Sequence, residues 1–177
     1  TKDGTKTARC DNGCGTKNTV VDKGSKKTNP SQSPKIKIGQ KLQNSVGVRC
    51  AITGKNTAEC IGYVGKKNSV TIPPSLKYMG VTYQITSIKT KAFSGNKNLR
   101  SIVIPSSIRT IGSQAFFNCK NLRNITIKTP YLSKKTVGAK AFKGIHAKAK
   151  IKVSKKQKKA YQKLLKAKGA GKKVTIK

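Results

Sequence analysis

The chain has very few acidic residues. Among its 177 residues, four acids stand against 40 lysines and arginines, which gives a formal net charge of +36 at pH 7. Three of the acids, Asp3, Asp11 and Asp22, lie near the N-terminus, and Glu59 has no acidic residue near it in the sequence. Because general acid and base groups must be held together on a rigid scaffold, the composition argues against enzymes that use paired carboxylates.

Other residues on which catalytic sites depend are also scarce. There is one histidine, one methionine and no tryptophan. His146 has neither an acid nor a cysteine near it in the sequence, so we expect a surface or half-buried structural role for it. No glycine-rich loop with a phosphate-binding pattern occurs either. We therefore expect a protein that is not an enzyme and that has no cofactor and no metal ion.

Long apolar runs are missing as well. No run approaches the roughly 20 apolar residues that a membrane-spanning helix needs, so we expect no membrane insertion of this fragment. No signal peptide opens the sequence, and Thr1 in place of methionine suggests a mature or excised fragment.

Residues 1–44 contain few large apolar side chains and many Lys, Thr, Ser, Asn and Gly. Such a composition cannot bury enough surface to offset the entropy lost on ordering, so we expect a flexible tail. Cys10 and Cys14 supply two of the four ligands that a structural zinc ion needs, so a local disulfide or disorder fits this segment better.

The middle of the chain repeats itself. Residues 85–107 and 108–130 are similar contiguous copies, and residues 131–153 form a looser third copy. An Ala-Phe pair marks each copy, at Phe93, Phe116 and Phe142, with spacings of 23 and 26 residues. A unit of this length cannot bury its apolar side alone and must stack on its neighbours, which predicts a solenoid.

Each unit contains a short strand with alternating character. Ile102 and Ile104 share one face and are predicted to point inward, as are Ile125 and Ile127 in the next unit. Cys119 follows a turn, where a small buried thiol is expected. The outward positions of the successive strands form a predicted ladder of Ser69, Thr71, Ser101, Val103, Asn124, Thr126, Lys150 and Lys152.

Both ends of the repeats differ from the middle. Residues 45–68 predict a β-hairpin around a Gly-Lys-Asn turn, which would place Cys50 opposite Cys60, either as a disulfide or as two free thiols. At the other end, Ser154 is predicted to begin a helix that Gly169 ends, and VTIK could add a final strand. The apolar stripe of that helix is predicted to be Ala160, Tyr161, Leu164 and Leu165.

The repeats resemble the BspA-like, or treponemal-type, leucine-rich repeats of bacterial surface proteins. The family pattern I-x-x-I-G-x-x-A-F-x-x-C-x-x-L-x-x-I-x-I matches residues 108–127 at nearly every place, and its Cys falls on Cys119. Lys89 replaces the usual Gly of the first unit, Asn96 replaces its Cys, and Lys148 stands where the third unit should have Leu. The resemblance covers residues 69–153. The start of the chain looks like the remnant of a small Cys module found in such proteins.

The resemblance implies an α/β repeat fold, namely a short leucine-rich-repeat solenoid that is mostly β with short helical turns. We expect a hairpin cap at residues 45–68, repeats at 69–153 and a helix-strand cap at 154–177. The family implies a non-catalytic module, secreted or at the surface of a Gram-positive bacterium, and we expect it to be a monomer. It would mediate adhesion by binding a host or bacterial surface protein, or an anionic glycan, through the concave strand face.

The lysines leave other functions open. From Lys134 to the end, 17 of 44 residues are lysine. A surface of this kind attracts polyanions in general, so nucleic acid, teichoic acid or a sulfated glycan could be the ligand itself. Only five basic residues are arginine, and no aromatic residues are interleaved with them, so we expect any binding of nucleic acid to be non-specific. A lysine coat that only keeps the protein soluble, on a passive spacer domain, is a further alternative.

Overall fold

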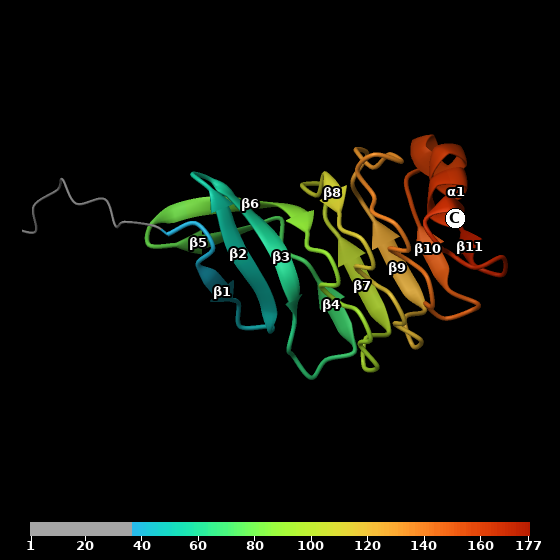
Figure 1. Ribbon diagram of the computed structural model, residues 1–177, viewed down its shortest axis with the longest axis horizontal. Coiled ribbons are helices and arrows are strands. Elements are labelled where there is room, and N and C mark those ends of the chain that lie inside the picture. Colours follow the sequence, from blue (N-terminus) through green and yellow to red (C-terminus); the bar gives the residue numbers. More distant parts are fainter. Residues whose placement is uncertain (1–36) are drawn as a thin grey trace, which may run out of the picture. The chain divides into compact units, whose positions relative to one another are not determined.

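The strands of successive repeats lie side by side in one parallel sheet. The computed structural model describes residues 37–177, and its five-stranded sheet has the order β11-β10-β9-β7-β4 (Figure 1). The strands are β4 (Ser69–Thr71), β7 (Ser101–Ile104), β9 (Asn124–Ile127), β10 (Lys150–Lys152) and β11 (Thr175–Ile176). All four strand pairings are parallel, because the chain passes through the rest of one repeat unit before it forms the next strand of the sheet.

The predicted alternation along these strands is confirmed. Ile102 and Ile104 of β7 are fully buried, as is Ile151 of β10, whereas the side chains between them are exposed or half-buried. One face of the sheet therefore covers the core, and the other face, which carries the predicted ladder, meets solvent.

The Ala-Phe pairs form a second stack behind the sheet. The ring of Phe116 lies between those of Phe93 and Phe142, with centroid distances of 5.2 and 5.4 Å. The amide of Phe93 donates to Ala115 at 2.8 Å, and the amide of Phe116 donates to Ala141 at 2.9 Å. Each turn is thus tied to the next through its backbone. These segments are hydrogen-bonded turns and not helices, so of the two alternatives from the sequence, a brief helical or an irregular turn, the structure has the second.

A six-stranded sheet occupies the N-terminal half of the described chain. It contains β1 (Lys41–Gln43), β2 (Val48–Gly54), β3 (Thr57–Tyr63), β5 (Ser75–Tyr78), β6 (Val81–Ile88) and β8 (Thr110–Ile111). The strand order is β1-β2-β3-β6-β5, with β8 paired to β6. Since β6 runs parallel to both β3 and β8, it connects the hairpin β2–β3 to the repeats.

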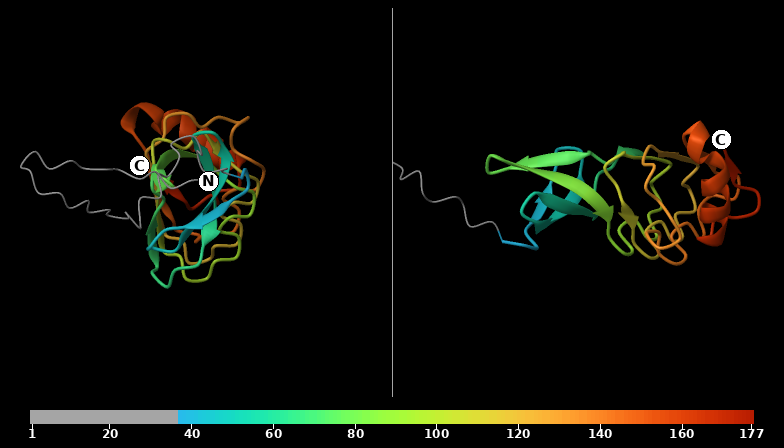
Figure 2. Two further views of the ribbon diagram at one scale, coloured as in Figure 1. Left: turned by 90° about the vertical axis from the view of Figure 1, so that its left-hand side faces the viewer. Right: turned by 90° about the horizontal axis from the view of Figure 1, so that it is seen from above.

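Two of these strands were not anticipated. We expected residues 1–44 to be a tail, yet Leu42 of β1 pairs with Cys50 of β2, so the folded region begins before Ser45. The irregular first unit also contains an antiparallel hairpin, β5–β6, whose turn at Met79 and Gly80 has positive φ at both residues. Figure 2 shows this hairpin extending away from the repeats.

The described chain ends in a 3-10 turn, a helix and a strand. Ser154 precedes the turn η1 (Lys155–Gln157), and its hydroxyl accepts from the amide of Gln157. Helix α1 (Lys158–Ala167) buries Tyr161, Leu164 and Leu165, whereas the predicted stripe residue Ala160 is exposed, because it lies on the solvent side of the helix. β11 then pairs in parallel with β10.

Tyr161 fixes the helix to the third repeat. Its hydroxyl donates to the carbonyl of Thr129 at 2.7 Å and accepts from the amide of Leu132 at 3.1 Å. The amide of Phe142 also donates to the carbonyl of Lys168, at 3.1 Å, just after the helix. The helix therefore continues the backbone contacts that link one repeat turn to the next.

Candidate binding face

The eight predicted ladder residues lie in two rows across the five-stranded sheet. In one row, Ser69, Ser101, Asn124 and Lys150 are paired strand by strand, and Thr175 continues the row on β11. In the other row, Thr71, Val103, Thr126 and Lys152 are paired in the same way. The structure thus brings all eight together on one face, held in register by backbone hydrogen bonds. We call the two rows, including Thr175, the strand face.

The character of the strand face changes from one edge to the other. The residues from β4, β7 and β9 are neutral, whereas β10 contributes Lys150 and Lys152, both exposed. Neighbouring strands are about 4.8 Å apart, so the change from neutral to basic takes place over one strand spacing. The face therefore offers a basic end next to a polar, uncharged surface.

An open depression of about 530 Å³ lies at this basic end. Strands β9 and β10 contribute Asn124, Ile125, Thr126, Lys150 and Lys152 to its border. The remaining border residues follow β10 and β11, and they are Val153, Lys155 and Lys177. The depression thus combines an amide, a hydroxyl and four ammonium groups, and no acidic side chain.

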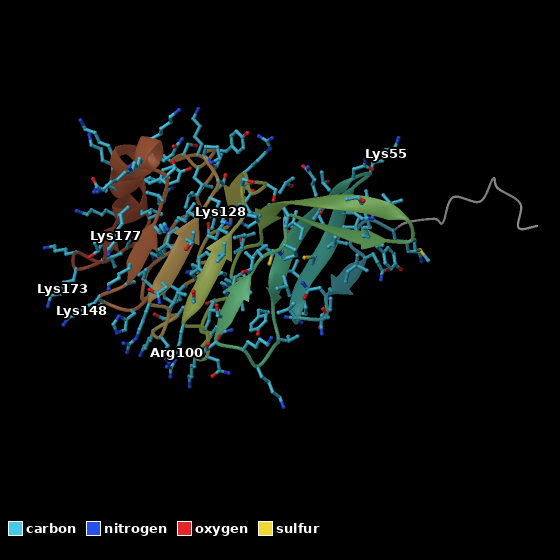
Figure 3. The ribbon with its side chains drawn as sticks, turned by 180° about the vertical axis from the view of Figure 1, so that it is seen from behind. Lys55, Arg100, Lys128, Lys148, Lys173 and Lys177 are labelled. Carbon is cyan, nitrogen blue, oxygen red and sulfur yellow. The ribbon has the colours of Figure 1, made fainter. Side chains whose placement is uncertain are left out.

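Lys177 is held at the depression by its backbone. Its amide donates to Ile151 at 2.9 Å, and its carbonyl accepts from the amide of Val153 at 2.9 Å. These bonds place Lys177 beside Lys152 on the neighbouring strand. Figure 3 shows Lys148, Lys173 and Lys177 at this same end of the domain. Like charges opposed across two strands repel each other, so the local charge favours the approach of an anion.

Within residues 37–177, no acidic side chain lies beside the lysines of the depression to neutralise them. In residues 37–177 the one acidic side chain is Glu59, on β3, which pairs with Lys89 at 3.3 Å. Lys89 stands where later units have Gly112 and Gly138, and its amide donates to Cys60 of β3 instead of to another repeat. A pair this exposed contributes less than about 1 kcal/mol.

Sequence reasoning found the strand positions but missed Thr175, Lys155 and Lys177. The alternation of inward and outward residues in each repeat identified the ladder, and VTIK was recognised only as a possible added strand. Its parallel register beside β10 could have extended the ladder to Thr175. The position of Lys155 depends on the turn after β10, for which the repeats offer no equivalent.

The three cysteines within residues 37–177 do not belong to the strand face. Cys50 and Cys60 are directly opposite each other on β2 and β3, as the predicted hairpin requires. Both are buried, and both are free thiols rather than a disulfide. Their mutual hydrogen bond raises the pKa of Cys60, which burial raises further, and lowers the pKa of Cys50. Cys119 is buried in the repeats, donates to the carbonyl of Phe93 at 2.9 Å, and has its pKa raised by burial to about 11.

The single histidine has a structural contact. His146 is half-buried, and its Nδ1 accepts from the amide of Lys148 at 3.2 Å. No group of three or more His, Cys, Asp or Glu side chains in the described part of the chain could hold a metal ion. None of the helices within residues 37–177 has the length and apolar character needed to cross a bilayer. Cys10 and Cys14 lie outside the described residues.

The repeat pattern matches one protein family. Residues 66–177 match the family described as "BspA type Leucine rich repeat region (6 copies)", which is well over half of the chain. The chain belongs to the BspA-type leucine-rich-repeat family. The match extends beyond residues 69–153, where the resemblance was expected to end, and it includes α1 and β11. No curated protein gives a significant match to the chain.

Two solved structures are similar to this chain, and the first of them supports the fold. A leucine rich cell surface protein from Faecalibacterium prausnitzii A2-165 is 22% identical, with a TM-score of 0.51 over 71% of this chain and 38% of that chain. A leucine-rich repeat protein from Bacteroides ovatus ATCC 8483 is 25% identical, with a TM-score of 0.46 over 73% of this chain and 35% of that chain. The first likeness shows a leucine-rich-repeat fold, here mostly strands with one short helix. This BspA-type chain spans little more than a third of the length of either protein.

Proposed function

We propose that this chain is a non-catalytic binding module of a bacterial cell-surface protein and that its strand face contacts the partner. The observation that carries the proposal is the pairing of the outward side chains into two rows on a hydrogen-bonded sheet. A rigid sheet fixes the spacing of these side chains before binding, so little entropy is lost when a ligand contacts them. Stacked repeats commonly use such extended surfaces for recognition.

The family and one similar structure support a proposal for the location of the protein. The similar protein from Faecalibacterium prausnitzii is described as a leucine rich cell surface protein. We propose the same location for this chain, on the cell surface or secreted. In this setting the module would bind a host or bacterial surface protein or an anionic glycan.

We further infer that the two ends of the repeats act as caps. The hairpin β2–β3 covers one end through the pairing of β3 with β6. At the other end, α1 places Leu164 and Leu165 in the core, and the carbonyl of Lys168, just after the helix, accepts the bond from the amide of Phe142. Capped ends keep the apolar stack from solvent, as a short repeat array requires.

A binding screen tests the proposed function. The 177-residue chain would be screened against arrays of matrix proteins and glycans, together with the double variant Ser101→Gln/Val103→Gln. This variant places two larger neutral side chains in the middle of the strand face. The matched control is Thr82→Gln/Thr110→Gln, which alters two exposed strand positions of the other sheet.

We expect at least one partner to bind, and the strand-face variant to lose that partner while the control retains it. A partner retained equally by both variants would show that the middle of the strand face, at Ser101 and Val103, is not the binding surface. A screen without any partner would favour a passive spacer domain.

A further inference from the structure

We propose that the depression at the basic end of the strand face binds an anionic carbohydrate chain whose charges are sulfate, phosphate or carboxylate groups. The inference rests on the proposed function, because it names the ligand class of the same face. Four lysines from three separate segments border one depression: Lys150 and Lys152 of β10, Lys155 of η1 and Lys177 after β11. A group bound there would contact several ammonium groups at once.

The arrangement of these lysines concentrates positive charge on one side of the sheet. Lys150 and Lys152 are two positions apart on one strand and so share a face, and Lys177 lies beside Lys152. No acidic side chain of residues 37–177 lies beside them, since the one such side chain, Glu59, pairs with Lys89 on the other sheet. Mutual repulsion is then relieved when an anion binds between them, which raises the affinity for a ligand with closely spaced negative charges.

The other groups at the depression suit a sugar. The Asn124 amide offers two donors and an acceptor, and the Thr126 hydroxyl offers one donor and two lone pairs. Sugar hydroxyls need partners of both kinds, and these two side chains are adjacent to the lysines.

Nucleic acid fits the depression less well. Proteins that bind single strands stack bases on aromatic side chains, and base edges are read chiefly by Arg, Asn and Gln. No residue that borders the depression is aromatic or arginine, and Asn124 is the one amide among them. Lysine presents a compact point charge that contacts sulfate or phosphate without the fixed fork of arginine.

An acidic protein partner is disfavoured by the same composition. The centres of protein–protein interfaces are rich in Tyr, Trp, Phe, Met and Arg and are depleted in Lys. The depression has four lysines and none of the enriched residues. A ligand with dispersed charge and many hydroxyls therefore matches its chemistry best.

Titration calorimetry with defined probes tests this inference. The probes are a sulfated gluco-oligosaccharide, a phosphorylated manno-oligosaccharide and an oligogalacturonate, whose charges are sulfate, phosphate and carboxylate respectively. A neutral oligosaccharide, an oligothymidylate and an oligoglutamate of similar length provide the comparisons. Binding is measured with the full chain at about 0.15 M NaCl, where weak long-range attraction is largely screened.

The variant Lys150→Gln/Lys152→Gln removes two charges from the depression, and Lys163→Gln/Lys166→Gln removes two from exposed positions of α1. The two variants have the same net charge, so a difference in their affinity for a probe shows where on the protein the probe binds. We expect at least one anionic oligosaccharide to bind, and the depression variant to weaken it about tenfold against less than about twofold for the helix variant. Thermal unfolding should be the same for both variants, because all four side chains are exposed.

Three outcomes would overturn the inference: no binding of any anionic oligosaccharide, equal weakening by both variants, or tighter binding of the oligothymidylate or the oligoglutamate. The proposed function fails separately. A screened partner that is lost in Ser101→Gln/Val103→Gln, together with no binding of the oligosaccharides, would support the strand face and reject the depression. These two residues do not border the depression, so the two tests are independent.

Discussion

The ring of Phe116 stacks on the ring of Phe142, with centroids 5.4 Å apart and an angle of 21° between the ring planes. The ring of Phe93 stacks on the other side of Phe116, at 5.2 Å and 15°. Phe116 is fully buried, so it contacts the repeat units on both sides and has no solvent-facing surface. It therefore joins three repeats into one core.

The substitution Phe116→Ala should lower the free energy of unfolding by about 3–5 kcal/mol, because it removes a large buried side chain and leaves a cavity that the neighbouring repeats cannot close. Urea unfolding followed by circular dichroism measures the loss. The control is Phe117→Ala at the next position, where the ring is half-buried, and a smaller loss is expected. Equal losses in the two variants would contradict the special role of the stack.

Cys50 and Cys60 should form a disulfide in an oxidising buffer. Directly opposed strand residues have Cβ atoms near the separation that a disulfide needs, and Cys50 and Cys60 are paired directly across β2 and β3. The lowered pKa of Cys50 makes it the first of the pair to become a thiolate, which begins the exchange. The bond should raise the free energy of unfolding by about 2–3 kcal/mol.

Thiol counting on denatured protein tests this expectation, in a Cys10→Ser/Cys14→Ser background that leaves three cysteines. After exposure to oxidised glutathione we expect one remaining thiol per chain, and three in the reduced sample. The single variant Cys50→Ser is the control, in which Cys60 should stay reactive once the protein is denatured. Three thiols after oxidation would show that the pair resists closure.

Cys119 should make the domain less stable at high pH. Burial raises the pKa of its thiol from the ordinary 9.0 to about 11. The unfolded chain therefore loses this proton at a lower pH than the folded chain does. The stabilisation is complete below about pH 9 and is lost as the pH rises towards 11, by roughly 2–3 kcal/mol for a shift of this size.

The measurement is the free energy of unfolding at several pH values between about 8 and 11, for the natural sequence and for Cys119→Ala. Lysines and tyrosines titrate in the same range, so the informative quantity is the difference between the two proteins. That difference should shrink as the pH rises. A difference that is independent of pH would mean that the thiol ionises equally well in both states.

Gly112 should not tolerate a side chain. A Cβ atom at this position would lie 2.3 Å from the backbone nitrogen of Thr90 in the preceding repeat, and backbone cannot move aside cheaply. We expect Gly112→Ala to lower the free energy of unfolding by about 1–3 kcal/mol or more. Gly171→Ala is the matched control, because its Cβ would meet only Val174, at 4.0 Å. Thermal unfolding of both variants decides the point, and equal midpoints would contradict the predicted clash.

The same contact explains why the first repeat has Lys89 in the place of Gly112. The neighbour of Lys89 is strand β3 of the hairpin and not another repeat, and the amide of Lys89 donates to the carbonyl of Cys60 on that strand. Its side chain extends to Glu59, at 3.3 Å. The departure from the family pattern was visible in the sequence, whereas its tolerance depends on the different neighbour.

The burial of side chains was predicted correctly where the sequence repeats a strong pattern, and strands without such a pattern were missed. The alternation in β7 and β9 fixes which side chains are buried, since a shift of one residue would expose Ile102 and Ile125. β1 has only three residues and little pattern, and it becomes a strand because the edge of β2 is available for pairing. Ala160 was assigned to the buried stripe from helical spacing, but the direction in which α1 packs leaves it in solvent.

By itself, the sequence determined the repeat, the inward and outward positions of each strand, the opposed cysteines of the hairpin and the strong positive charge, because all of these follow from local spacing and composition. Only the tertiary structure decided that Lys150, Lys152, Lys155 and Lys177 share one depression. Lys177 reaches it after the chain passes through α1 and adds β11 beside β10. No local pattern specifies that return, since it depends on where the helix packs against the last repeat and on which strand edge remains free.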